Sequence, residues 1–123
     1  MTDETPLSPR IDTVFLPVAR FGTAVDWYVE VFGFDVRWRD DDAGYAAIEV
    51  GETPLTLVRD DDPSDDRDGH QRFNFFTDDI EATHETLTSR GVEVSPVEAA
   101  PGIRFFTFQD VDGNRLGFCE YEA

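Results

Sequence analysis

The chain has 123 residues, of which 40% are hydrophobic, enough for a single domain with its own core. Its formal net charge is −17 at pH 7, and a surface of that charge repels duplex nucleic acid and anionic lipid, so we exclude both as partners. No apolar run approaches the roughly 20 residues that a membrane span needs, and no secretory leader is visible, so we expect a cytoplasmic protein.

The composition of the charge points to the source of the protein. All ten basic residues are arginine, and the sequence contains no lysine. Such an acidic surface suits a protein that must stay soluble in concentrated salt, where charge repulsion is screened within about 3 Å. We therefore predict a halophilic source, with an ordinary soluble acidic protein as the alternative.

The first half of the chain predicts one helix among four strands. Residues 1–10 are polar and proline-containing, which is typical of a flexible terminus. The helix is expected at residues 23–33, because its apolar residues follow helical spacing, Thr23 can cap it and Gly33 can end it. The strands are expected at residues 11–18, 34–39, 44–50 and 53–59.

An acidic stretch, residues 60–69, separates this module from a second one. Its aspartates lack the spacing of a calcium loop, so we interpret it as a solvated linker. The second module, residues 70–123, predicts a helix at residues 78–91, with an aspartate cap and Gly91 as its end. Its strands are expected at residues 70–77 and 92–98 and in a hairpin spanning residues 105–121.

Residues 11–59 and 70–123 therefore share the order β-α-β-β-β. Val14 corresponds to Phe73, and Leu55 corresponds to Leu116. This repeat predicts an α+β fold, with two βαβββ modules in tandem whose mixed sheets curl around a shared cleft. Each helix is expected to cover the outer face of its own sheet.

Two segments resemble the vicinal oxygen chelate superfamily, which includes glyoxalase I, extradiol dioxygenases and bleomycin-resistance proteins. The segment FGTAVDWYVEVFGFDV, residues 21–36, is similar to the family's first helix and its exit into the next strand. The segment DVDGNRLGF, residues 110–118, resembles the family's turn before the last strand, with Val111 where proline is usual. The resemblance covers about residues 11–121 and implies the fold and a homodimer.

The acidic turn in this hairpin invites a catalytic or metal-binding interpretation. However, aspartate and asparagine favour turns because they bond to their own backbone, and Gly113 permits a positive φ. We therefore predict that Asp110, Asp112 and Asn114 are structural.

The resemblance also locates the positions where metal-using relatives carry their ligands. Counting from the motifs places these positions at Thr13, Thr56, Arg72 and Gly117. A transition-metal site needs about three converging nitrogen, carboxylate or thiolate donors, and none of these four residues is a usual ligand. We predict no metal and no cofactor, although a divalent ion stays possible if Glu49 and Glu120 point inward. His70 and His84 are not expected to replace the missing ligands.

Strand alternation predicts which side chains line the cleft. The ligand-binding residues that we expect are Arg72, Asn74, Phe76, Thr13, Phe15, Thr56 and Cys119. Arg72 is the strongest candidate, because a cation in a half-apolar cleft favours a carboxylate or phosphate, unless it pairs with Glu49 or Glu120. Cys119, the single cysteine, is expected to be a packed thiol rather than a nucleophile.

Three functions remain open at this point. The favoured one is a metal-free small-molecule binding protein resembling the bleomycin-resistance branch, whose members sequester a ligand between two subunits without catalysis. The main alternative is a metal-dependent lyase, isomerase or dioxygenase of the glyoxalase I type. The third is a structural or regulatory module with a filled cleft.

Overall fold

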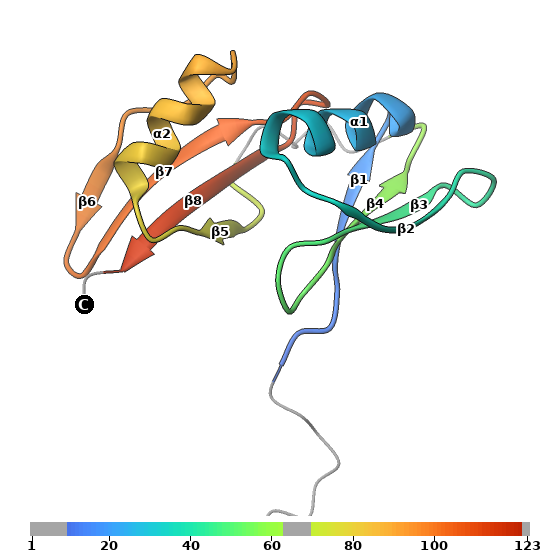
Figure 1. Ribbon diagram of the computed structural model, residues 1–123, viewed down its shortest axis with the longest axis horizontal. Coiled ribbons are helices and arrows are strands. Elements are labelled where there is room, and N and C mark those ends of the chain that lie inside the picture. The colour runs from blue at the N-terminus through green and yellow to red at the C-terminus, as the bar shows by residue number, and fades with distance from the viewer. Residues whose placement is uncertain (1–9, 63–69, 122–123) are drawn as a thin grey trace, which may run out of the picture.

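Two modules with the same order of elements make up the computed structural model, which describes residues 10–62 and 70–121 (Figure 1). Most of the predicted flexible terminus, residues 1–9, and most of the predicted linker, residues 63–69, lie outside the described residues. Both described parts follow the predicted order β-α-β-β-β.

The first module is a four-stranded mixed sheet with one helix. Its elements are β1 (Val14–Val18), α1 (Phe21–Phe32), β2 (Val36–Asp40), β3 (Tyr45–Ile48) and β4 (Leu55–Arg59). The strand order is β1-β4-β3-β2, with β1 parallel to β4 and the other pairs antiparallel. A parallel pair needs a crossover connection, and the segment containing α1 begins that crossover.

The second module repeats this topology. Its elements are β5 (Asn74–Phe76), α2 (Ile80–Ser89), β6 (Glu98–Ala100), β7 (Ile103–Gln109) and β8 (Arg115–Tyr121). The strand order is β5-β8-β7-β6, and β5 is parallel to β8. Val14 pairs with Leu55 in the first sheet, and Asn74 pairs with Gly117 in the second. Phe73 and Leu116, the predicted counterparts of Val14 and Leu55, directly precede Asn74 and Gly117 in the chain. The repeat inferred from the sequence is therefore confirmed.

Several element boundaries differ from prediction. Thr23 does not cap α1, because the helix begins two residues earlier and its N-cap is Arg20, which makes no side-chain cap bond. Gly33 does end the helix, with φ 75° in the left-handed region. The strand expected at residues 92–98 is replaced by an isolated bridge from Val94 to Phe108 and by β6 further along. Pro96 explains this shift, since proline has no N–H for a ladder.

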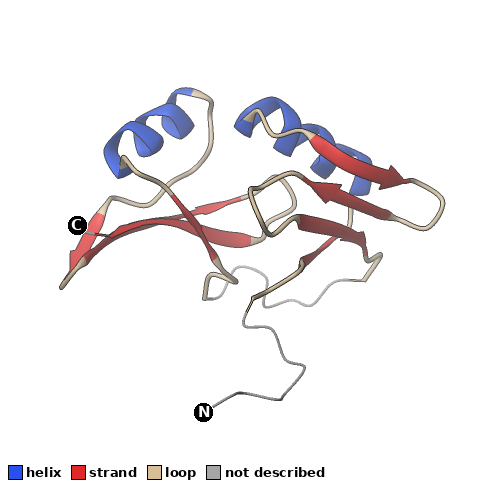
Figure 2. Cartoon of the chain, turned by 60° about the horizontal axis from the view of Figure 1, so that its bottom comes forward, coloured by secondary structure: helices blue, strands red, loops and turns tan. Residues whose placement is uncertain are grey.

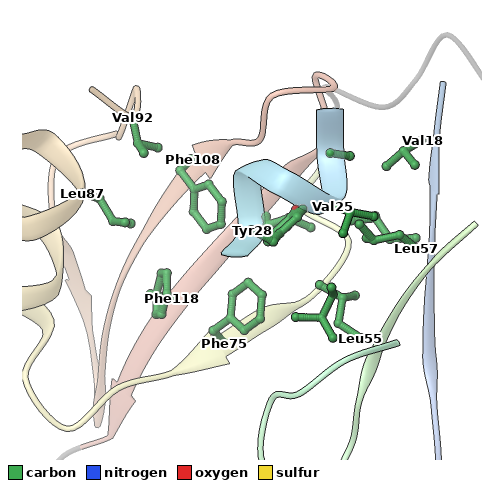
Figure 3. Close-up of a cluster of buried hydrophobic side chains, with 14 of the residues drawn as sticks. Val18, Val25, Tyr28, Leu55, Leu57, Phe75, Leu87, Val92, Phe108 and Phe118 are labelled. Atoms are coloured by element: carbon green, nitrogen blue, oxygen red, sulfur yellow. The ribbon is translucent and has the colours of Figure 1, made fainter. Parts of the chain in front are cut away.

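One continuous core joins both modules. Tyr28 on α1 is fully buried and faces Phe75, Phe108 and Phe118 of the second sheet, while Leu55 and Leu57 pack on its other side (Figure 3). Both helices lie on the same side of the strands, which leaves the other side of each sheet uncovered by helix (Figure 2). In the described residues, no helix is long and apolar enough to cross a bilayer.

Candidate functional site

The acidic turn between β7 and β8 is a structural joint between the modules. The Asp112 carboxylate accepts hydrogen bonds from the backbone N–H groups of Ala19 at 2.9 Å and Arg20 at 3.0 Å. Asn114 donates from Nδ2 to the carbonyl of Pro17 at 3.1 Å. The turn therefore holds the end of β1 and the start of α1, and its predicted structural role is confirmed. The sequence did not reveal that these bonds cross between modules.

Asp110 in the same turn is buried beneath α1. Its carboxylate accepts the hydroxyl of Tyr28 at 2.7 Å and the backbone N–H groups of Asp112 and Asn114. Burial raises the pKa of Asp110, against the opposing effect of these hydrogen bonds. Burial also raises the pKa of Tyr28 well above its usual value, and the nearby Asp110 charge adds to this increase. Tyr28 is 0% exposed and Asp110 is 6% exposed, so neither side chain presents a reactive atom to a ligand. Their hydrogen bond stabilises the packing of α1 on the turn.

The four positions where metal-using relatives carry ligands do not suit a metal ion. Thr13 donates its hydroxyl to Asp12, Thr56 is buried within β4, and Arg72 is a cation. At Gly117 an added Cβ would overlap the Oδ1 atom of Asn74 and lie 3.0 Å from the carbonyl of Phe106. The Asn74 amide thus occupies the space in which a ligand side chain at position 117 would begin.

The other donors that could have filled the gap are engaged elsewhere. Glu49 forms an ion pair with Arg37, and Glu120 accepts the N–H of Ile80 while lying near Arg104. His84 bonds through Nε2 to the carbonyl of Ser95 at 2.8 Å, and the exposed His70 contacts the carbonyl of Gln71. Within residues 10–62 and 70–121, no three His, Cys, Asp or Glu side chains lie close enough to hold a metal ion. These residues do not fit a metal centre.

The sheet faces turned away from the helices, here called the open faces, carry the residues predicted to line the cleft. In the first sheet Phe15 pairs with Thr56, and both side chains belong to this face because Leu16 and Leu57 face the core. Trp38 and Tyr45 lie on the same face, opposite Ala47 and Val58 in the ladder. Phe15 is 61% exposed and Trp38 is 49% exposed.

The open face of the second sheet combines aromatic and polar groups. Asn74 and Phe76 pair with Gly117 and Cys119, and the Phe76 ring stacks on Tyr121 with centroids 6.3 Å apart. Phe76 is 60% exposed and Tyr121 is 62% exposed. Cys119, only 4% exposed, is a packed thiol as predicted and offers little surface to a ligand.

Arg72 lies in a bend two residues before Asn74, the first residue of β5, and it is exposed. Its backbone N–H bonds to the carbonyl of Arg115, so the two arginines are neighbours across the sheet. Glu49 and Glu120, the acids that were considered as partners, are bound to other groups. In the described part of the chain no acidic side chain pairs with Arg72.

The expected residues form two groups rather than one enclosed cleft. Thr13, Phe15 and Thr56 belong to the first module, and Arg72, Asn74, Phe76 and Cys119 belong to the second. A hollow of about 180 Å³ lies where the modules meet, and residues of both contribute to it, including Val14, Leu55, Asn74 and Phe76. A hollow of about 470 Å³ lies elsewhere, between the two helices.

Three residues of the open faces, Trp38, Tyr45 and Tyr121, were missing from the sequence-based set. Trp38 and Tyr45 are brought beside Thr56 by the ladders from β2 through β3 to β4. Tyr121 was accessible to sequence reasoning, because it continues the alternation of Gly117 and Cys119. Trp38 was not, because the register of β2 shifts between Val36 and Trp38.

Residues 10–118 match the glyoxalase/bleomycin resistance protein/dioxygenase superfamily. Among solved structures, the chain resembles TnmS3, an antibiotic-binding protein from Streptomyces sp. CB03234, with 28% identity, TM-score 0.81, and coverage of 97% of this chain and 100% of that one. It also resembles a glyoxalase/bleomycin resistance protein from the same organism, with 30% identity, TM-score 0.71, and coverage of 88% and 98%. No functionally curated protein matches the sequence. The chain belongs to the glyoxalase/bleomycin resistance protein/dioxygenase superfamily.

Proposed function

We propose that the protein binds a small aromatic compound against its open faces without a metal ion and without catalysis. The observation that carries this proposal is the distribution of exposed apolar side chains. Among the described residues, seven large hydrophobic side chains are exposed, and five of them lie on the open faces: Phe15, Trp38, Tyr45, Phe76 and Tyr121.

The acidity of the protein does not explain this distribution. Charged residues make up 30% of the chain, so solubility alone does not account for five aromatic rings on one side. Clustered exposed apolar groups mark interaction surfaces, and aromatic rings contribute large contact area together with stacking geometry. A flat aromatic ligand would cover these apolar groups and stack on their rings.

Arg72 and Asn74 supply the polar part of the proposed site. Asn74 lies two residues before Phe76 in β5, and the exposed Arg72 precedes Asn74 by two residues. A guanidinium can bind a carboxylate or phosphate through two parallel hydrogen bonds. We infer that the ligand carries an anionic group for Arg72, beside its aromatic part.

A second copy of the chain would complete the site. One open face covers only one side of a ligand, whereas ligand sites usually bury most of the ligand surface. The resemblance to TnmS3, described as antibiotic-binding, supports a small-molecule ligand. We infer a homodimer whose open faces enclose the ligand, in the cytoplasm of a halophile, as the acidic lysine-free composition suggests.

A thermal-shift screen tests this function. The chain, in molar KCl with EDTA, is heated with a panel of aromatic compounds that includes anionic, neutral and cationic members. We expect a concentration-dependent rise in melting temperature for aromatic anions, because a ligand that binds only the folded state stabilises it. Stabilisation that appears only with Ni²⁺, Zn²⁺, Fe²⁺ or Mn²⁺ would instead support the metal-dependent enzyme.

A further inference from the structure

A hollow of about 470 Å³ lies between the end of α1, the length of α2 and β5. We call it the interhelical groove. Its floor consists of the aromatic side chains of Phe32, Phe34, Phe75 and Phe118. Phe75 and Phe118 face the helices, so the groove lies mainly on the helix side of the second sheet, and Phe76 at the edge lines both the groove and the open face. The volume falls within the range of about 300–1,000 Å³ typical of ligand sites.

The groove exists because α2 carries small residues on the side that faces α1. Ala82, Thr83 and Thr86 line it, where a helix packed tightly against Phe32 would need larger apolar residues. α2 buries only Ile80 and Leu87, whereas α1 buries four residues. The space between the helices is therefore not filled by side chains.

The two walls are tied together at one end. The guanidinium of Arg90, which follows α2, donates a hydrogen bond to the carbonyl of Val31 in the last turn of α1. At the other end the Asp79 carboxylate caps α2, accepting the N–H of Ala82 at 3.0 Å. Glu120 also holds the start of α2 by accepting the N–H of Ile80 at 2.7 Å. These ties oppose collapse of the groove.

The chemistry of the groove selects a ligand. Phe32 meets Phe34 and Phe75 edge to face, at centroid distances of 5.2 and 5.8 Å, and this arrangement offers ring surfaces to an aromatic guest. Arg90 has further N–H donors beyond the one given to Val31, and Thr86 adds an exposed hydroxyl. Asp79 is the acidic group of the lining and stands at the opposite end, so it repels an anion toward Arg90.

We propose that the interhelical groove is a second small-molecule site, which takes a flat fused-ring aromatic compound with one anionic group held by Arg90. This goes beyond the function proposed for the open faces, since the groove is complete within one chain and needs no second copy. It predicts one molecule in the groove of each chain, separate from any molecule on the open faces.

Titration with 8-anilinonaphthalene-1-sulfonate, followed by calorimetry and by the fluorescence of the dye, tests the proposal on the full chain. Thr86→Glu places bulk and negative charge in the groove, and Thr88→Glu is the matched control, because Thr88 is exposed on the same helix outside the lining. We expect about tenfold weaker binding for Thr86→Glu, which is about 1.4 kcal/mol, and several-fold weaker binding for Arg90→Gln. Thr88→Glu should bind as the unchanged protein does, and the open-face variant Tyr121→Ala should keep the binding component that Thr86→Glu weakens.

Equal affinity in all four variants would overturn the proposal, because the dye would then bind outside the groove. Weakening by Tyr121→Ala but not by Thr86→Glu would place the dye on the open face, which contradicts the groove site while supporting the proposed function. Near-ultraviolet circular dichroism must show a packed core in every variant, because this dye also binds loosely packed states. If Thr86→Glu fails that check, Thr86→Gln replaces it, with Thr88→Gln as its control.

Discussion

Replacing Asp112 by alanine should lower the free energy of unfolding, since this side chain joins the two modules through hydrogen bonds. The change removes the acceptor for two backbone N–H groups, those of Ala19 and Arg20. An unsatisfied buried donor costs about 1–3 kcal/mol. Ala19 is half-buried and Arg20 is exposed, so water can reach both N–H groups after the substitution. We therefore take about 1–1.5 kcal/mol for each of the two donors. The expected loss is about 2–3 kcal/mol of unfolding free energy, out of a total of about 5–15 kcal/mol.

Urea denaturation in molar KCl, followed by circular dichroism, measures this loss. With a urea dependence of about 2 kcal/mol per molar, the midpoint should fall by about 1–1.5 M. Asp112→Asn keeps one acceptor oxygen, so its loss should be about half as large. Asp42→Ala, at an exposed aspartate in the β2–β3 turn, is the control and should change stability by less than about 0.5 kcal/mol. A midpoint for Asp112→Ala equal to that of the control would refute the role of the turn as a joint.

Three further predictions concern stability and ligand binding. Folding raises the pKa of Tyr28, so the stability that this group contributes is present below its unfolded pKa of about 10 and is lost as pH rises through the higher folded pKa. Tyr28→Phe should reduce this loss of melting temperature at alkaline pH. At pH 7 the same change should cost about 1–3 kcal/mol of unfolding free energy, because Asp110 loses a hydrogen-bond donor. Gly117→Ala should lower the unfolding free energy measured with urea by about 1–3 kcal/mol, because the added methyl group overlaps the Asn74 amide. Asn74→Ala in the same chain should recover part of that loss, and strict additivity of the two changes would disprove the overlap. Melting temperature should rise steadily from dilute buffer to molar KCl, and full stability in dilute buffer would argue against a halophilic origin.

Local patterns were sufficient to predict the order of the elements. Burial of one face of a strand or helix leaves a periodic pattern of apolar residues in the sequence. This pattern is present in the alternation of Phe73, Asn74 and Phe75 and in the helical spacing of residues 21–32. The start of α1 was misplaced because Asp112, more than 90 residues away, holds the backbone N–H groups of Ala19 and Arg20 directly before the helix. A local cap motif at Thr23 cannot reveal a partner supplied by tertiary structure.

The candidate site was predicted less completely than the fold. Phe15, Asn74 and Phe76 could be placed on the open faces from strand alternation alone. Trp38 reaches the same side only through a register shift in β2, and such a shift has no clear signal in one sequence. The interhelical groove also escaped prediction, since it depends on how far α2 stands from Phe32 and not on any motif in either segment.

Calorimetric titration of the most stabilising aromatic anion from the thermal-shift panel, in molar KCl with EDTA, tests the central claim most directly. We predict saturable binding without any metal ion that weakens about tenfold or more in Phe15→Ala, Tyr121→Ala and Arg72→Ala, because each removes a contact of the proposed site. Unchanged affinity in all three variants, or heat that appears only after a divalent metal is added, would contradict it.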